Sequence, residues 1–137
     1  MKNIYKIIWA DALHQTKLKN PNIDNRSLIW ENLSFLSIIT SFNLGVIVIG
    51  VSYYLGLPFQ LKLGLLMPGS LIDGILSGVI QLYLPSIVFN YFVVFFKNKH
   101  LRIMDKYPSK GGKAVLTYIY ISLGIIVLAV ILTSFFK

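Results

Sequence analysis

Three long stretches without charge constrain the fold of this chain more than any other feature. Residues 32–61 contain no charged side chain, residues 63–96 contain only Asp73, and residues 114–136 contain none. The hydrocarbon core of a bilayer is about 30 Å thick, and a helix of about 20 apolar residues crosses it. Helices are the default there because the backbone must satisfy its own hydrogen bonds. The sequence therefore predicts an all-α integral membrane protein with three transmembrane helices, near residues 33–55, 71–96 and 115–136.

Composition excludes most other classes of protein. Charged residues make up 13% of the chain, against about 25% in a typical soluble domain. The segments between the apolar stretches are too short to form a soluble catalytic domain. The 137 residues include no cysteine, which excludes disulfides, thiolate metal sites and thiol catalysis. The two histidines lie in separate segments without further ligands. We therefore expect no enzyme activity, no cofactor and no metal from this chain alone.

The distribution of charge predicts an orientation. The N-terminal segment has a net charge of +2 and residues 97–113 have +5, whereas the connection between the first two spans is neutral. Short basic segments stay on the cytoplasmic side. We expect a bacterial inner-membrane protein with a cytoplasmic N-terminus and an external C-terminus. The overall charge of +8 then indicates anionic lipid rather than nucleic acid as a partner. The predicted headgroup contacts are Lys97, Lys99, Arg102, Lys106, Lys110 and Lys113.

Residues 1–31 are predicted to be a cytoplasmic amphipathic segment preceding the transmembrane domain of residues 32–137. Residues 2–19 contain no Pro or Gly and favour a helix, with Ile4, Ile7, Ile8 and Leu18 on one arc. The main interpretation is an interfacial helix on the inner leaflet, anchored by Trp9 and Trp30. A docking helix for a protein partner is the alternative. Asn20-Pro21-Asn22 ends this helix, and Asp24, Asn25 or Ser27 can cap the next one.

Small residues form a face on each of the first two spans. Such faces let helix backbones approach closely in lipid. On the first span a polar pore lining is the alternative to packing. On the second span Gly74 and Gly78 form a GxxxG motif, Gln81 can bond a facing helix, and Pro85 should kink the helix. The predicted packing residues are Ser34, Ser37, Ser41, Gly45 and Ser52 on the first span, and Ser70, Gly74, Gly78, Gln81 and Pro85 on the second.

Two further motifs have a structural and a functional interpretation. Ser70 and Asp73 have the spacing of a helix cap, so we expect Asp73 to belong to a cap. The alternative is an intramembrane ion or proton site. The segment 108–113, Pro-Ser-Lys-Gly-Gly-Lys, superficially resembles a phosphate loop, but it lacks the first Gly and has Ala114 where Ser or Thr binds magnesium. A flexible basic loop is expected there. The alternating apolar pattern of residues 57–65 predicts either an irregular surface loop or an extended segment completed by a partner.

Three functions fit these features. The preferred one is a non-catalytic accessory or assembly subunit of a bacterial inner-membrane complex, acting through helix packing with a protein partner or with further copies of itself. A self-assembling pore, similar to holins in size, span number and basic inner loop, is the second. An immunity-type membrane binding protein, using the loop at 56–70, is the third.

Overall fold

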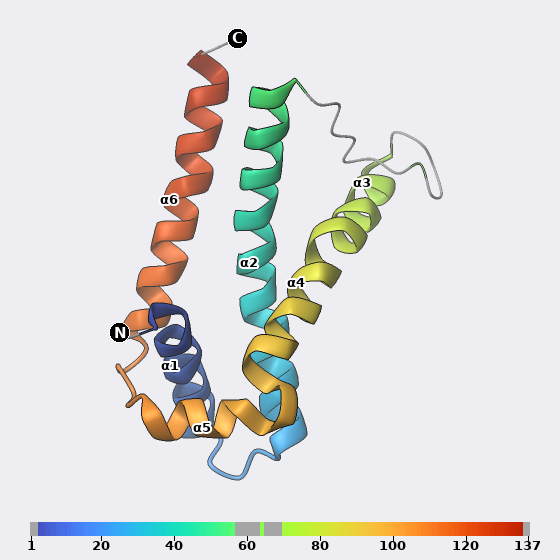
Figure 1. The fold of residues 1–137 in the computed structure, drawn as a ribbon. Helices are drawn as coiled ribbons and strands as arrows, with labels where there is room; N and C mark the ends of the chain where they lie inside the picture. The colour runs from blue at the N-terminus through green and yellow to red at the C-terminus, as the bar shows by residue number, and fades with distance from the viewer. Residues whose placement is uncertain (1–2, 57–63, 65–69, 136–137) are drawn as a thin grey trace.

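The structure is a computed structural model that describes residues 3–56, 64 and 70–135, and the regular elements within these ranges are all helical (Figure 1). Three helices are long and apolar enough to cross a membrane, namely Asn25–Leu55, Leu71–Lys106 and Lys113–Phe135. The helical class and the prediction of three helices able to cross a membrane are thus confirmed. The elements are α1 (Ile4–Lys19), α2 (Asn25–Leu55), α3 (Leu71–Gly78), η1 (Val79–Tyr83), α4 (Leu84–Asn90), η2 (Tyr91–Phe95), η3 (Phe96–Asn98), α5 (Lys99–Lys106) and α6 (Lys113–Phe135).

The helix α2 begins earlier than the predicted residue 33 because a cap precedes the apolar stretch. The carboxylate of Asp24 accepts a hydrogen bond of 3.2 Å from the backbone N–H of Ser27. Hydrogen bonding from Ser27, first from its side chain and then from its backbone N–H, holds the pKa of Asp24 below its usual value because it favours the charged form. At the other end Gly56 adopts a left-handed φ of 64°, and its N–H bonds the carbonyls of Ser52 and Tyr53.

The second span is interrupted by two wide turns. Pro85 follows the π-helical turn η1, in which the N–H of Leu84 bonds the carbonyl of Val79 five residues earlier. Proline has no N–H and its ring clashes with the carbonyl four residues before it, so a widened turn relieves the clash. A second π turn, η2, ends the span. In Figure 1, α3 leans away from α2, whereas α4 approaches it.

Residues 97–113 are not a continuous loop, because they contain the helix α5, whereas residues 107–112, which include most of the predicted basic loop, have no helix. Lys97 and Asn98 both have positive φ, 54° and 56°, and this sharp turn leads into α5. On α5 the buried side chains His100, Ile103 and Met104, followed by Tyr107, have the spacing i, i+3, i+4 and i+7 of one helix face. The basic side chains of this segment lie on the exposed side.

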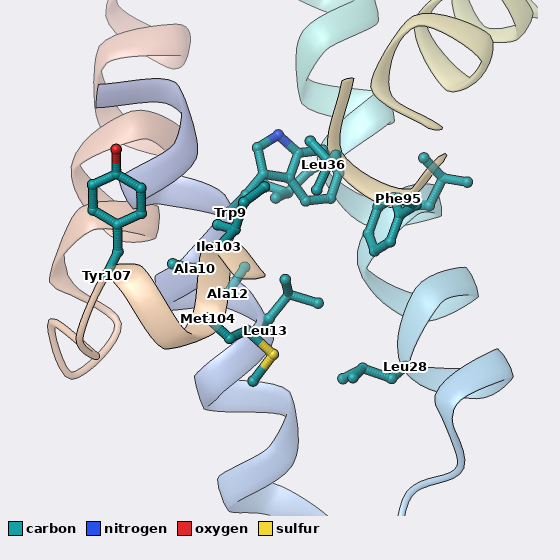
Figure 2. Close-up of a cluster of buried hydrophobic side chains, with 12 residues drawn as sticks. Trp9, Ala10, Ala12, Leu13, Leu28, Leu36, Phe95, Ile103, Met104 and Tyr107 are labelled. Carbon is teal, nitrogen blue, oxygen red and sulfur yellow. The ribbon is translucent and has the colours of Figure 1, made fainter. Parts of the chain in front are cut away.

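The core lies where α1 and α5 meet the start of α6 and the facing parts of α2 and η2. Figure 2 shows Trp9 directed toward Leu36, with Leu13 next to Met104. Trp9 is 1% exposed, and its ring centroid lies 5.3 Å from that of Phe95. Trp9 is therefore a core residue, and its predicted role as an interfacial anchor is wrong. Trp30, by contrast, is 54% exposed.

The helix α1 runs antiparallel to the first half of α6. Early residues of α1, such as Tyr5, share a groove with Tyr118, whereas Gln15 lies beside Gly112. Figure 1 shows α1 and α5 together at the end of the molecule where α6 begins. The middle of α1 is buried from Trp9 to Leu13. This helix is thus built into the bundle, and a position at the membrane surface remains a prediction.

Candidate functional site

The junction between α1 and the start of α6, which we name the α1 junction, is organised by one carboxylate. Asp11 is fully buried. Its Oδ1 accepts hydrogen bonds from the backbone N–H groups of Lys110, at 2.8 Å, and Gly112, at 3.0 Å. Its Oδ2 accepts from Ala114, at 3.0 Å, and Val115, at 3.4 Å. A negative charge at a helix N-terminus is favourable, because unpaired N–H groups and the helix dipole both point there.

The glycine pair in the preceding loop makes this arrangement feasible. Gly111 and Gly112 have φ of 65° and 83°, in the left-handed region that other residues rarely adopt. Successive backbone N–H groups in such a turn form a concave anion site. The sequence resemblance to a phosphate loop therefore has a physical basis, but the anion held by this loop is the protein's own Asp11.

His14 ties α1 to the end of α5, one helical turn beyond Asp11. Its Nε2 lies 3.1 Å from the carbonyl oxygens of both Met104 and Tyr107. Carbonyls only accept, so Nε2 carries the proton and donates to them. Asp11 thus binds the N-terminal end of α6, which carries the positive end of the helix dipole. His14, on the same side of α1, binds the C-terminal end of α5, which carries the negative end.

A second polar contact joins α1 to the two spans it faces. The Tyr5 hydroxyl donates to Asn90 Oδ1, and Asn90 Nδ2 donates to Ser37 Oγ at 2.9 Å. Asn90 and Ser37 are both fully buried. Buried polar groups of this kind need partners, and here one amide supplies a partner to each of two other helices.

A third polar contact joins α2 to α6. Asn43 Nδ2 donates to Ser122 Oγ at 2.9 Å and to the Tyr118 hydroxyl at 3.3 Å. Asn43 Oδ1 is buried and has no hydrogen-bond partner within the described ranges. The part of α6 beyond this contact exposes most of its side chains.

The predicted packing face of α2 points at least partly toward the second span. Ser37 and Gly45 are buried, and Ser34, Ser41 and Ser52 are half-buried. A Cβ on Gly45 would lie 3.1 Å from Leu82 Cδ1, so the two helices approach closely there.

On the second span the structure buries a different face from the predicted one. Its buried polar residues are Asp73, Ser77, Ser86 and Asn90. The predicted residues Ser70, Gly74, Gly78 and Gln81 are half-buried and Pro85 is exposed. A Cβ on Gly74 or Gly78 would meet nothing within 4 Å. The GxxxG motif therefore makes no close contact with the other described residues, and its use by a partner stays a prediction.

Asp73 lies in the predicted helix cap. Ser70 Oγ accepts from the N–H of Asp73 at 3.1 Å, and Asp73 Oδ2 accepts from the N–H of Gly64 at 3.2 Å. Asp73 is fully buried. The cap explains its position, and an ion or proton role remains untested. The rest of the alternating segment lies outside the described residues.

The six predicted headgroup contacts are all exposed, from Lys97 to Lys113. Lys99 Nζ donates to the carbonyl of Phe92 at 3.2 Å and lies 6.0 Å from the centroid of the Phe96 ring. Lys106 lies over the Tyr107 ring, at 5.6 Å. In residues 3–56, 64 and 70–135 no three His, Cys, Asp or Glu side chains gather in a group that could hold a metal ion.

Comparison with family models, with curated proteins and with solved structures finds no match to this chain. Its three apolar helices indicate a multi-pass membrane protein. The function therefore rests on the arrangement of its own residues.

Proposed function

We propose that this chain is a non-catalytic assembly subunit of a bacterial inner-membrane complex, acting through the packing of its helices against a protein partner. The observation that carries this proposal is that polar side chains which are buried or half-buried bond to other helices of the same chain. Asp11, His14 and Asn90 all hold helices of the same chain together. Polar groups used in this way supply rigidity rather than chemistry.

The outer surface supports a role in packing. Only 6% of the most apolar stretch of α6 is buried within the chain, and 22% of the corresponding stretch in each of the other two spans. The uncovered small residues Gly74, Gly78 and Gly124 offer positions where a second helix can approach closely. The proposed topology has the N-terminus and α5 in the cytoplasm, because the basic residues of α5 are exposed on the same end of the bundle.

A holin-like pore has less support. A pore lined by the serine face of α2 would need those side chains to face an aqueous space. Ser37 is fully buried and accepts its hydrogen bond from Asn90. The immunity-type alternative depends on the loop at 56–70, most of which lies outside the described residues.

The GxxxG motif provides the test of this proposal. The double variant Gly74→Ala, Gly78→Ala adds two methyl groups that meet no described residue within 4 Å. Alanine also favours a helix over glycine, so the isolated chain should keep or gain stability. Against a closely packed partner helix the methyl groups would clash, and we expect association to weaken about tenfold. The measurement is cross-linking and co-purification from native membranes in mild detergent.

Two matched variants make the result interpretable. Gly50→Ala on α2 also meets nothing within 4 Å, so it should keep or raise stability in the same way and leave association unchanged. Gly45→Ala brings a methyl to 3.1 Å from Leu82 Cδ1, which must shift to make room, so it should be less stable than Gly50→Ala. Recovery of a lone monomer from native membranes, with no co-purifying protein, contradicts the proposal.

A further inference from the structure

A groove of about 590 Å³ runs between α1 and the first half of α6. One wall is the apolar arc of α1, with Ile4, Ile7 and Ile8, and the other includes Thr117 and Ile121 of α6. Two cations, Lys110 and Lys113, lie at the end where α6 begins. This size falls in the range of about 300–1,000 Å³ that is typical of small-molecule sites.

The polar groups of the groove walls have partners within the chain, so the surface offered to a ligand is apolar. Thr117 Oγ1 donates to the carbonyl of Lys113 at 2.7 Å, and the Tyr118 hydroxyl accepts from Asn43. Lys110 and Lys113 differ from these polar groups, since both lysines are exposed and make no ion pair with any described residue. The nearest acid, Asp11, is buried and binds backbone N–H groups.

The dimensions of the groove match one leaflet of a bilayer. Lys113 begins the spanning helix, and Ile121 lies eight residues further on, about 12 Å at 1.5 Å per residue. Half of the hydrocarbon core is about 15 Å. Positive charge at headgroup depth followed by an apolar wall of this length complements an anionic lipid.

We propose that this groove binds one anionic phospholipid, with its phosphate at Lys110 and Lys113 and an acyl chain along Thr117 and Ile121. The helix α1 supplies half of the site, which gives the exposed Ile4 and the half-buried Ile7 and Ile8 a function. This inference rests on the proposed membrane embedding and orientation, but it does not depend on any protein partner.

The test uses the full chain purified in non-ionic detergent and native mass spectrometry. Dioleoylphosphatidylglycerol and dioleoylphosphatidylcholine are added at equal concentration. We expect about one phosphatidylglycerol per chain to be retained, with about a thirtyfold preference, the size expected for two lysines near an anionic headgroup. The double variant Lys110→Gln, Lys113→Gln should lose this preference. It keeps the backbone N–H of Lys110, so the bond to Asp11 remains.

The matched control is Lys99→Gln, Arg102→Gln, which removes the same charge from α5 and should keep the preference. Thr117→Phe, which fills the groove without adding charge, should reduce retention. An equal loss in both charge-removing variants would mean diffuse surface attraction and would overturn the proposal. Persistence of the preference after Lys110→Gln, Lys113→Gln would also overturn it. So would a dimer that excludes the lipid and is lost in Thr117→Phe, because the groove would then belong to a second copy.

Discussion

Asp11 is the residue on which the α1 junction depends most directly. In Asp11→Asn an amide NH₂ group replaces one oxygen and faces backbone donors instead of accepting from them. We expect the free energy of unfolding to fall by about 2–4 kcal/mol, since hydrogen bonds to a charged group are worth about 1.5–3 kcal/mol each. Denaturant unfolding in detergent micelles measures this change. Asp105→Asn, on the exposed side of α5, is the control and should change little. Equal stabilities for the two variants would contradict the role of Asp11.

Asp24 gives a pH dependence at the same scale. Its pKa is lowered in the folded protein by the hydrogen bonds from Ser27, so its contribution is complete above its unfolded pKa and is lost as the pH falls through the folded value. Asparagine caps a helix about as well without titrating. Between about pH 4 and pH 2 the unfolding midpoint of the unmodified protein should therefore fall more steeply than that of Asp24→Asn. Parallel profiles for the two proteins would show that this cap carries no charge-dependent stability.

The sequence predicted the local caps and missed the distant ones. Asp24 and Ser70 bond backbone groups three residues away, a spacing that is visible in the sequence. Asp11 only interrupted an apolar arc, because its partners lie about 100 residues further along the chain. The unusual loop Lys-Gly-Gly-Lys at 110–113 was the available signal, and a buried anion in place of phosphate would have been the correct interpretation.

Among the elements, α1 is the one whose position can be tested by accessibility. The protein has no cysteine, so Ala10→Cys introduces a single thiol at a fully buried position. This thiol should react slowly with a maleimide while α1 is docked. Adding Tyr5→Phe removes the hydroxyl that bonds Asn90, and we expect the reaction to become about fivefold to tenfold faster, as the loss of one hydrogen bond of about 1 kcal/mol predicts. Asp105→Cys, at an exposed position on α5, sets the rate of a free thiol. An unchanged rate after Tyr5→Phe would show that the Asn90 contact does not hold α1.

The three long helices were predictable because the length and apolar composition of a stretch are sufficient to predict a helix that can cross a membrane. The helix α5 was also accessible to prediction, since His100, Ile103, Met104 and Tyr107 follow helical spacing, but their basic neighbours favoured a loop. The buried face of the second span was not predictable from helix geometry alone. The π turn η1 rotates the residues that follow it, so Asn90 faces Ser37 whereas Pro85 faces outward.

For the whole molecule, the proposed orientation makes a prediction about labelling in intact cells. Asp105→Cys on α5 retains every basic residue, and Ser134→Cys lies near the end of α6; both positions are exposed. A membrane-impermeant maleimide should label Ser134→Cys from outside and leave Asp105→Cys unlabelled, because short basic segments stay in the cytoplasm. Permeabilised cells should label both variants, which controls for reactivity. Labelling of both thiols in intact cells would contradict three crossings.

The bond between Asp11 and the start of α6 also has a consequence for biogenesis. Ribosomes deliver the chain from its N-terminus, so Asp11 emerges roughly 100 residues before the N–H groups that it binds. The segment made first must therefore wait, with its carboxylate solvated, until the last span has been threaded. Formation of the α1 junction is then a late event. On a ribosome stalled before residue 110, the helix α1 would lack the N–H groups that Asp11 binds and could not dock.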